Sequence, residues 1–148
     1  MRRHLGAVVL LLALTACGAP PPLACPAIAA PAGVAIDVPA GQFTRADVEV
    51  CWSGQCTRRQ TELPPATAAG PTTCSASACA APAVPTGGRH GFVEIPGLPA
   101  APVDVTITFD NGRPRRATIH PRPIATGPAC GAAGPQARLV VGPDGAIG

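Results

Sequence analysis

The sequence predicts an all-β protein, a single disulfide-stapled β-sandwich of about seven strands. Three observations lead to this fold class. The apolar runs are short and are bounded by glycine, proline or aspartate. No stretch keeps a helical period of about 3.6 residues, and 20 prolines interrupt most windows. The chain has 7 cysteines but only 3 phenylalanines and 1 tryptophan, so its thin core needs cross-links.

The expected strands are short and separated by turn residues. Residues 103–109 give the clearest pattern, because apolar and polar side chains alternate along them as in a half-buried strand. In a second strand, Phe92 is expected to point inward. The predicted strands lie at residues 33–38, 46–52, 89–95, 103–109, 115–120 and 138–141.

Asn111-Gly112 is a strong hairpin signal between two of these strands. The returning strand is expected to turn Ala117 and Ile119 inward. A plain two-residue turn would place Ile119 opposite Asp104, on the wrong face. We therefore expect an extra residue or a bulge in this loop, with Pro114 as a reason for it.

Cys51 and Cys56 flank Trp52-Ser53-Gly54-Gln55, which predicts a hairpin with a two-residue turn. In that register the two cysteines face each other at a non-hydrogen-bonded position, about 4.5 Å apart at Cα, which suits a disulfide. Glu49 then lies opposite Arg58, and Val48, Val50 and Trp52 share the core face. Arg59 falls opposite Val48 on that face, so the return strand is expected to be short, bulged or at an edge.

Two alternatives compete with the disulfide at this hairpin. A redox pair would normally have two intervening residues, and here four intervene. A structural zinc site needs further cysteines or histidines. The sequence therefore favours a disulfide between Cys51 and Cys56 and predicts no metal site.

Residues 61–88 are expected to form one long loop rich in proline and alanine. A second disulfide, Cys74–Cys79, would restrain that loop, and Cys25–Cys130 would then join the ends of the domain. Six cysteines allow fifteen pairings, and a crossed pairing between the two local pairs stays open.

The N-terminus predicts the compartment. Arg2 and Arg3 precede the apolar run 5–14, which is too short for a bilayer span of about 20 residues. The run ends in Leu14-Thr15-Ala16-Cys17, which resembles the bacterial lipobox at every position. This resemblance implies that Cys17 carries a diacylglycerol and becomes the mature N-terminus. An ordinary secretory signal is the alternative.

The expected organisation follows from that motif. Residues 1–16 are a lipoprotein signal peptide, residues 17–32 are the lipidated cysteine and a proline-rich tether, and residues 33–148 are the β-sandwich domain. The resemblance places the protein on the extracytoplasmic face of the cell membrane, lipid-anchored through Cys17. The short strands are similar to those of immunoglobulin-like or transthyretin-like domains, although no diagnostic motif of either is present.

No catalytic constellation stands out, so we expect neither an enzyme nor a cofactor. None of Ser53, Ser75 and Ser77 lies in a nucleophile-elbow motif, and His90 and His120 are expected to be exposed. Arginines and acids nearly balance after residue 16, which argues against a nucleic-acid partner.

The sequence is compatible with three functions. The first is a noncatalytic, lipid-anchored protein with a structural or protein-interaction role at the cell envelope. The second is a binding or inhibitor-like module that presents the 74–79 loop. The third is thiol–disulfide exchange at Cys51 and Cys56.

Overall fold

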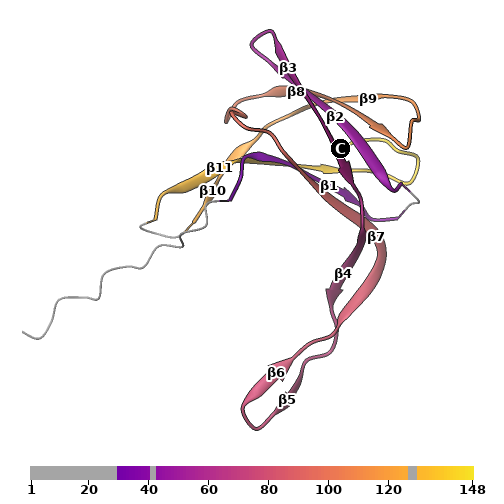
Figure 1. Ribbon diagram of the computed structural model, residues 1–148, viewed down its shortest axis with the longest axis vertical. Coiled ribbons are helices and arrows are strands. Elements are labelled where there is room, and N and C mark those ends of the chain that lie inside the picture. Colours follow the sequence, from indigo (N-terminus) through magenta and orange to yellow (C-terminus); the bar gives the residue numbers. More distant parts are fainter. Residues whose placement is uncertain (1–29, 41–42, 127–129) are drawn as a thin grey trace, which may run out of the picture.

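The computed structural model describes residues 30–40, 43–126 and 130–148. Eleven strands and no helix occur among these residues, so the predicted all-β class is confirmed and the predicted number of about seven strands is too low. None of them forms a helix that could cross a membrane. The strands build two larger sheets and one small ribbon (Figure 1).

The first sheet has the order β10-β11-β1-β7-β4, and the second has the order β3-β2-β8-β9. The small ribbon is β5-β6. The first sheet consists of β1 (Gly33–Val38), β4 (Pro65–Ala69), β7 (Ala83–Glu94), β10 (Arg122–Ala125) and β11 (Ala132–Val140). The second consists of β2 (Arg45–Trp52), β3 (Gln55–Glu62), β8 (Val103–Phe109) and β9 (Arg115–Ile119), and the ribbon of β5 (Thr73–Ser75) and β6 (Ala78–Ala80).

One hydrophobic core joins the two larger sheets. Both supply alternate aliphatic side chains, such as Val34 and Ile36 from β1 and Val48 and Val50 from β2. Among the aromatic residues that the structure describes, Phe109 alone is fully in this core, with Phe43 stacked on it at 4.6 Å between ring centroids. The core is therefore aliphatic, and small side chains fill the space between the sheets.

The central strand of the first sheet, β1, makes two long-range pairings. β1 pairs with β11 in parallel and with β7 in antiparallel orientation. All other pairings between named strands are antiparallel. Since β1 lies in the middle of its sheet, it brings residues near both ends of the domain side by side.

The β2–β3 hairpin has the register that its sequence predicts. Cys51 lies opposite Cys56 and Glu49 opposite Arg58. Ser53 and Gly54 both have positive φ, 48° and 76°, as a type I′ turn requires. Arg59 does lie opposite Val48. Its side chain is exposed because β3 is the edge strand of its sheet, which was one of the three expected explanations. β3 is neither short nor bulged.

The β8–β9 hairpin also follows its prediction. Val103, not Asp104, lies opposite Ile119, so the loop between Phe109 and Arg115 contains the expected extra residue. Asp110 and Asn111 take positive φ there. Phe92 differs from expectation: it is only partly buried, while Val93 beside it is 3% exposed and belongs to the core. The inward face of β7 is thus shifted by one residue.

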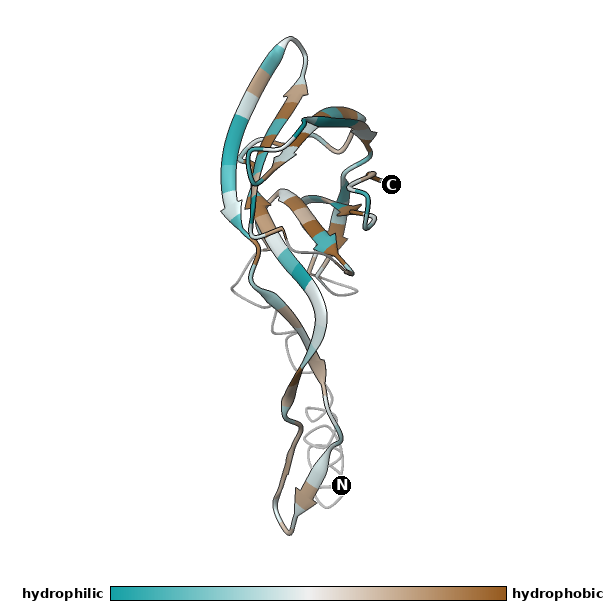
Figure 2. Cartoon of the chain, turned by 90° about the vertical axis from the view of Figure 1, so that its right-hand side faces the viewer, coloured by the Kyte–Doolittle hydropathy of each residue, from teal (hydrophilic) through white to brown (hydrophobic). Residues whose placement is uncertain are grey.

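Residues 61–88 were expected to be a loop, and this expectation is wrong. They contain the end of β3, then β4, β5 and β6, and the first half of β7. β4 and β7 form a two-stranded ribbon that continues into β5–β6 and projects away from the two sheets (Figures 1 and 2). We call residues 65–88 the arm.

Candidate functional site

The arm is the most prominent surface feature of the described residues. Almost every residue from Pro65 to Gly87 is exposed, including Val84 at 44%. The stretch 63–88 contains no charged residue and no histidine. Figure 2 shows that the arm lacks the strongly hydrophilic segments found on the two sheets. An exposed, ordered and uncharged ribbon is unusual, because such edges attract other strands.

A disulfide holds the tip of the arm. Cys74 lies opposite Cys79, with 4.0 Å between their Cα atoms. Residues 76–77 make the turn, and Thr73 Oγ1 donates to the carbonyl of Ala80 at 3.4 Å. With no core beneath it, the tip is ordered by this cross-link and by its short ladder. The loop expected around these cysteines is therefore a presented β-hairpin.

The base of the arm is fixed to the domain. Leu63 is 1% exposed and donates its N–H to the Thr44 carbonyl at 2.7 Å, at the point where the chain passes between the sheets. Gly91 leaves room for it, because a Cβ there would lie 2.6 Å from a Leu63 methyl. Arg89 Nη1 donates to the Leu63 carbonyl at 2.8 Å. The arm is thus held rigidly at one end.

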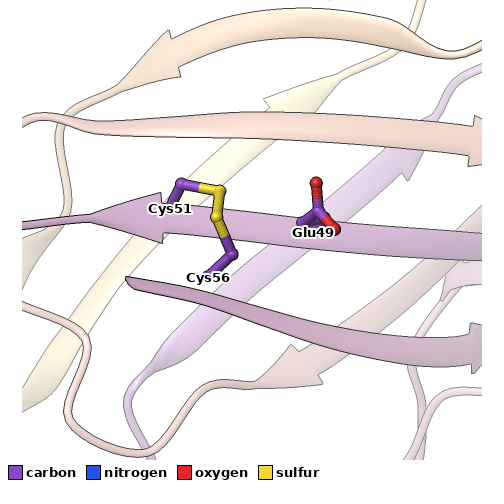
Figure 3. A group of neighbouring side chains, drawn as sticks. All are labelled: Glu49, Cys51 and Cys56. Atoms are coloured by element: carbon purple, nitrogen blue, oxygen red, sulfur yellow. A yellow bond between two sulfur atoms is a disulfide. The ribbon is translucent and has the colours of Figure 1, made fainter. Parts of the chain in front are cut away.

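Cys51, Cys56 and Glu49 form a second cluster, on the outer face of the second sheet (Figure 3). The three potential ligand atoms lie within 4.8 Å of one another. Cys51 and Cys56 are joined in a disulfide, with 4.1 Å between Cα atoms, and Glu49 is paired with Arg58 at 2.6 Å. Cysteine binds zinc as a thiolate, so the two disulfide-bonded cysteines offer no such ligand.

A shallow hollow of about 250 Å³ lies beside this cluster. Its lining combines carboxylates, a guanidinium and hydroxyls, which is a typical solvated sheet face. Glu49 and Arg58 neutralise each other within it. The residues that line it are Asp47, Glu49, Arg58, Thr106 and Thr108.

A third cluster lies on the outer face of the first sheet, where three neighbouring strands meet. Asp37 of β1 lies between His90 of β7 and Arg138 of β11. Its Oδ1 is 2.6 Å from His90 Nδ1, and its Oδ2 accepts from Arg138 Nε. Burial alone would raise the pKa of Asp37, but the hydrogen bonds and charges of His90 and Arg138 lower it below its usual value.

This third cluster supplies an acid–base pair without a serine nucleophile. Ser53 lies in the β2–β3 turn, and Ser75 and Ser77 lie at the tip of the arm. The carboxylate is paired with the Arg138 guanidinium and hydrogen-bonded to the His90 ring, and contacts of this kind join neighbouring strands. Sequence reasoning missed this cluster because its members are 53 and 101 residues apart.

The other sequence-predicted sites lie partly outside the described residues. Cys17, the expected lipidation site, does so entirely. Of the Cys25–Cys130 pair, only Cys130 is described, and it is disulfide-bonded. His120 is exposed at the end of β9.

Comparison with known protein families, curated proteins and solved structures finds no match for this chain. The functional reading therefore depends on the sequence motifs and the geometry above.

Proposed function

We propose that this protein is a noncatalytic, lipid-anchored β-sandwich protein with a structural or protein-interaction role on the extracytoplasmic face of the cell membrane, and that the arm is its contact element. The observation that carries the proposal is the arm itself, an ordered, exposed and uncharged ribbon stapled at its tip. Preordering such a segment lowers the entropic cost of association.

Of the two fold types that the strand pattern suggested, we infer the transthyretin-like one. In immunoglobulin-like domains strands B and C, the second and third, belong to different sheets. Here β2 and β3 form a hairpin within one sheet, and the central β1 is parallel to the last strand, β11. The strand order therefore differs from that of immunoglobulin-like domains, which supports the transthyretin-like alternative.

The lipid anchor is supported by Leu14-Thr15-Ala16-Cys17. A single acyl chain binds membranes reversibly, whereas two chains hold a protein stably. The tether 17–32 is long enough to hold the domain off the surface, since proline-rich chains extend about 3.1 Å per residue.

Anchoring is tested by Cys17→Ala. The unmodified chain should remain in the membrane fraction and should incorporate a clickable palmitate analogue, and the variant should lose both properties. A wild-type protein that is unlabelled and freely secreted would refute the anchored form.

The role of the arm is tested by shortening it without disturbing the domain. Residues 71–81 are replaced by Asn-Gly between Gly70 and Pro82, a pair already joined by a hydrogen bond of 2.8 Å. Cross-linking in intact cells should then lose the partners seen with the full arm. A matched control, Asp47→Asn on the outer face of the second sheet, should keep them. An unchanged partner profile in the shortened variant would remove the arm from the proposal.

A further candidate function is thiol–disulfide exchange at Cys51–Cys56, favoured by the exposure of Cys56 and the partial exposure of Cys51. It requires that mild dithiol reductant opens this disulfide while Cys74–Cys79 stays closed. Thiol labelling with peptide mapping decides between the two roles.

A further inference from the structure

The outer edge of β4 has an unusual pattern of backbone groups. Gly70 N–H donates to the Pro82 carbonyl at 2.8 Å, and residue pairs in an antiparallel ladder alternate. In the β4–β7 register Ala68 is therefore the residue that exchanges bonds with Val84. Thr67 and Ala69 consequently turn their N–H and C=O groups away from β7. Because β4 is the last strand of its sheet, these groups face outward.

The sequence around Ala68 is nearly symmetric. It reads Pro65-Ala66-Thr67-Ala68-Ala69-Gly70-Pro71, with a proline three residues to either side and small residues between. The two outward-facing residues lie symmetrically about Ala68, and the prolines that bound them have no N–H to donate. An edge that reads similarly in both directions suits antiparallel pairing with a copy of itself.

Charge separates this edge from the other three outer edges of the two larger sheets. β3 contains Arg58 and Arg59, β9 contains Arg115 and Arg116, and β10 contains Arg122. Charged residues on an edge strand oppose pairing with another chain. β4 has none, and neither does the rest of the arm. In a two-fold pairing like residues approach each other, so an uncharged edge is the one that can meet its own copy without repulsion.

We propose that two copies of this chain pair through their arms, β4 against β4, antiparallel about a two-fold axis at Ala68. Thr67 of each copy lies opposite the partner's Ala69, which gives four backbone hydrogen bonds. Pro65 lies opposite the partner's Pro71, where neither strand has a donor to leave unpaired. Ala68 faces its own copy at a non-hydrogen-bonded position, about 4.5 Å apart at Cα.

This pairing deepens the proposed function and rests on it in one respect. Four hydrogen bonds make a small interface, well below the usual size for stable association in solution. A lipid anchor would confine the copies to one surface and raise their effective concentration. The arms are therefore expected to pair on membranes and only weakly when the chain is free.

The test is disulfide trapping in membranes that contain the full chain. Ala68→Cys places a thiol at the two-fold axis, within the Cα separation that a disulfide spans. The matched control is Val84→Cys, which lies directly across the ribbon on β7 and is 44% exposed. With both β4 strands between them, the two thiols of the control would be about 14 Å apart at the strand spacing of about 4.8 Å. Under mild oxidation Ala68→Cys should give about tenfold more covalent dimer than Val84→Cys.

A second variant separates pairing from random collision. Adding Ala69→Pro to Ala68→Cys removes an outward-facing N–H, and an edge strand tolerates proline at such a position. Dimer trapping should fall about fivefold while the melting temperature stays unchanged. The inference is overturned if Ala68→Cys and Val84→Cys give equal yields of covalent dimer, or if adding Ala69→Pro leaves the yield unchanged. If trapping fails while the arm still cross-links to other proteins in cells, the self-pairing falls and the proposed function stands.

Discussion

Asp37 shows how single residues connect distant parts of this chain. Its carboxylate bonds to His90 and Arg138 across two strand pairings. Because these contacts lower the folded pKa of Asp37 below its unfolded value of about 3.9, its stabilisation is present above that pH. It is lost as the pH falls through the lower folded pKa.

Asp37→Asn should therefore be less stable than the unmodified chain near neutral pH, and the gap should narrow as the pH falls from about 5 to about 2. Urea unfolding across this range measures the gap. A gap that stays constant would show that the charge of Asp37 contributes nothing.

Asp110 has a comparable role in a loop. Its carboxylate accepts from the N–H groups of Thr44 and Arg45, at 3.0 and 2.9 Å, and from the Thr44 hydroxyl at 2.9 Å. These bonds join the β8–β9 loop to the start of β2. Burial alone would raise the pKa of Asp110, but these hydrogen bonds and the charge of Arg45 lower it.

Asp110→Ala is expected to lower the free energy of unfolding by about 1 kcal/mol, a figure reduced for solvent exposure. Asp110→Asn should retain more stability, because asparagine keeps an acceptor and tolerates the positive φ of 42°. Chemical denaturation at neutral pH compares the two variants. Equal losses would show that the side-chain acceptor is unimportant.

The two disulfide-bonded hairpins are alike in geometry but differ in their position relative to the core. Cys51–Cys56 and Cys74–Cys79 have the same sequence separation, 5, and nearly equal Cα distances. The first lies in a sheet that shares the core, and the second lies on the arm outside it. Equal cross-links should therefore have unequal effects on the domain.

Replacing Cys51 and Cys56 with serine is expected to lower the stability of the domain by up to about 2 kcal/mol in the chain-entropy model. The same change at Cys74 and Cys79 should leave the main unfolding transition unchanged and should free only the tip, as seen by faster proteolysis there. If both double variants lowered the midpoint equally, the arm would belong to the cooperative unit.

Elements whose contacts are local could be predicted from the sequence. The register of Cys51 with Cys56 followed from a two-residue turn, and the extra residue before Arg115 followed from the facing pattern of Ile119. The arm could not be predicted, because its prolines and alanines have low strand propensity. Its order depends on Leu63 at the base and on the disulfide at the tip.

At the scale of the whole molecule, the sequence indicated two layers but not their arrangement. The alternation along 103–109 marked a core face, yet nothing local showed that β1 lies between β7 and β11. Such pairings depend on total burial over the whole chain. For the same reason the Asp37 cluster could not be predicted from the sequence. The absence of charge from residue 63 to 88 can be read directly from the sequence, but the ribbon that these residues form cannot.

Among the described residues, the two larger sheets share one core, and the arm adds no side chain to it. Ile36 is fully buried at the centre of the first sheet, so Ile36→Ala should lower the free energy of unfolding by about 2–5 kcal/mol. Val84→Ala, on the arm, should change it by less than about 0.5 kcal/mol. Urea unfolding of the monomeric chain without its anchor measures both. A large decrease in the free energy of unfolding for Val84→Ala would mean that the arm packs against another part of the folded protein. The arm would then not be free to bind a partner.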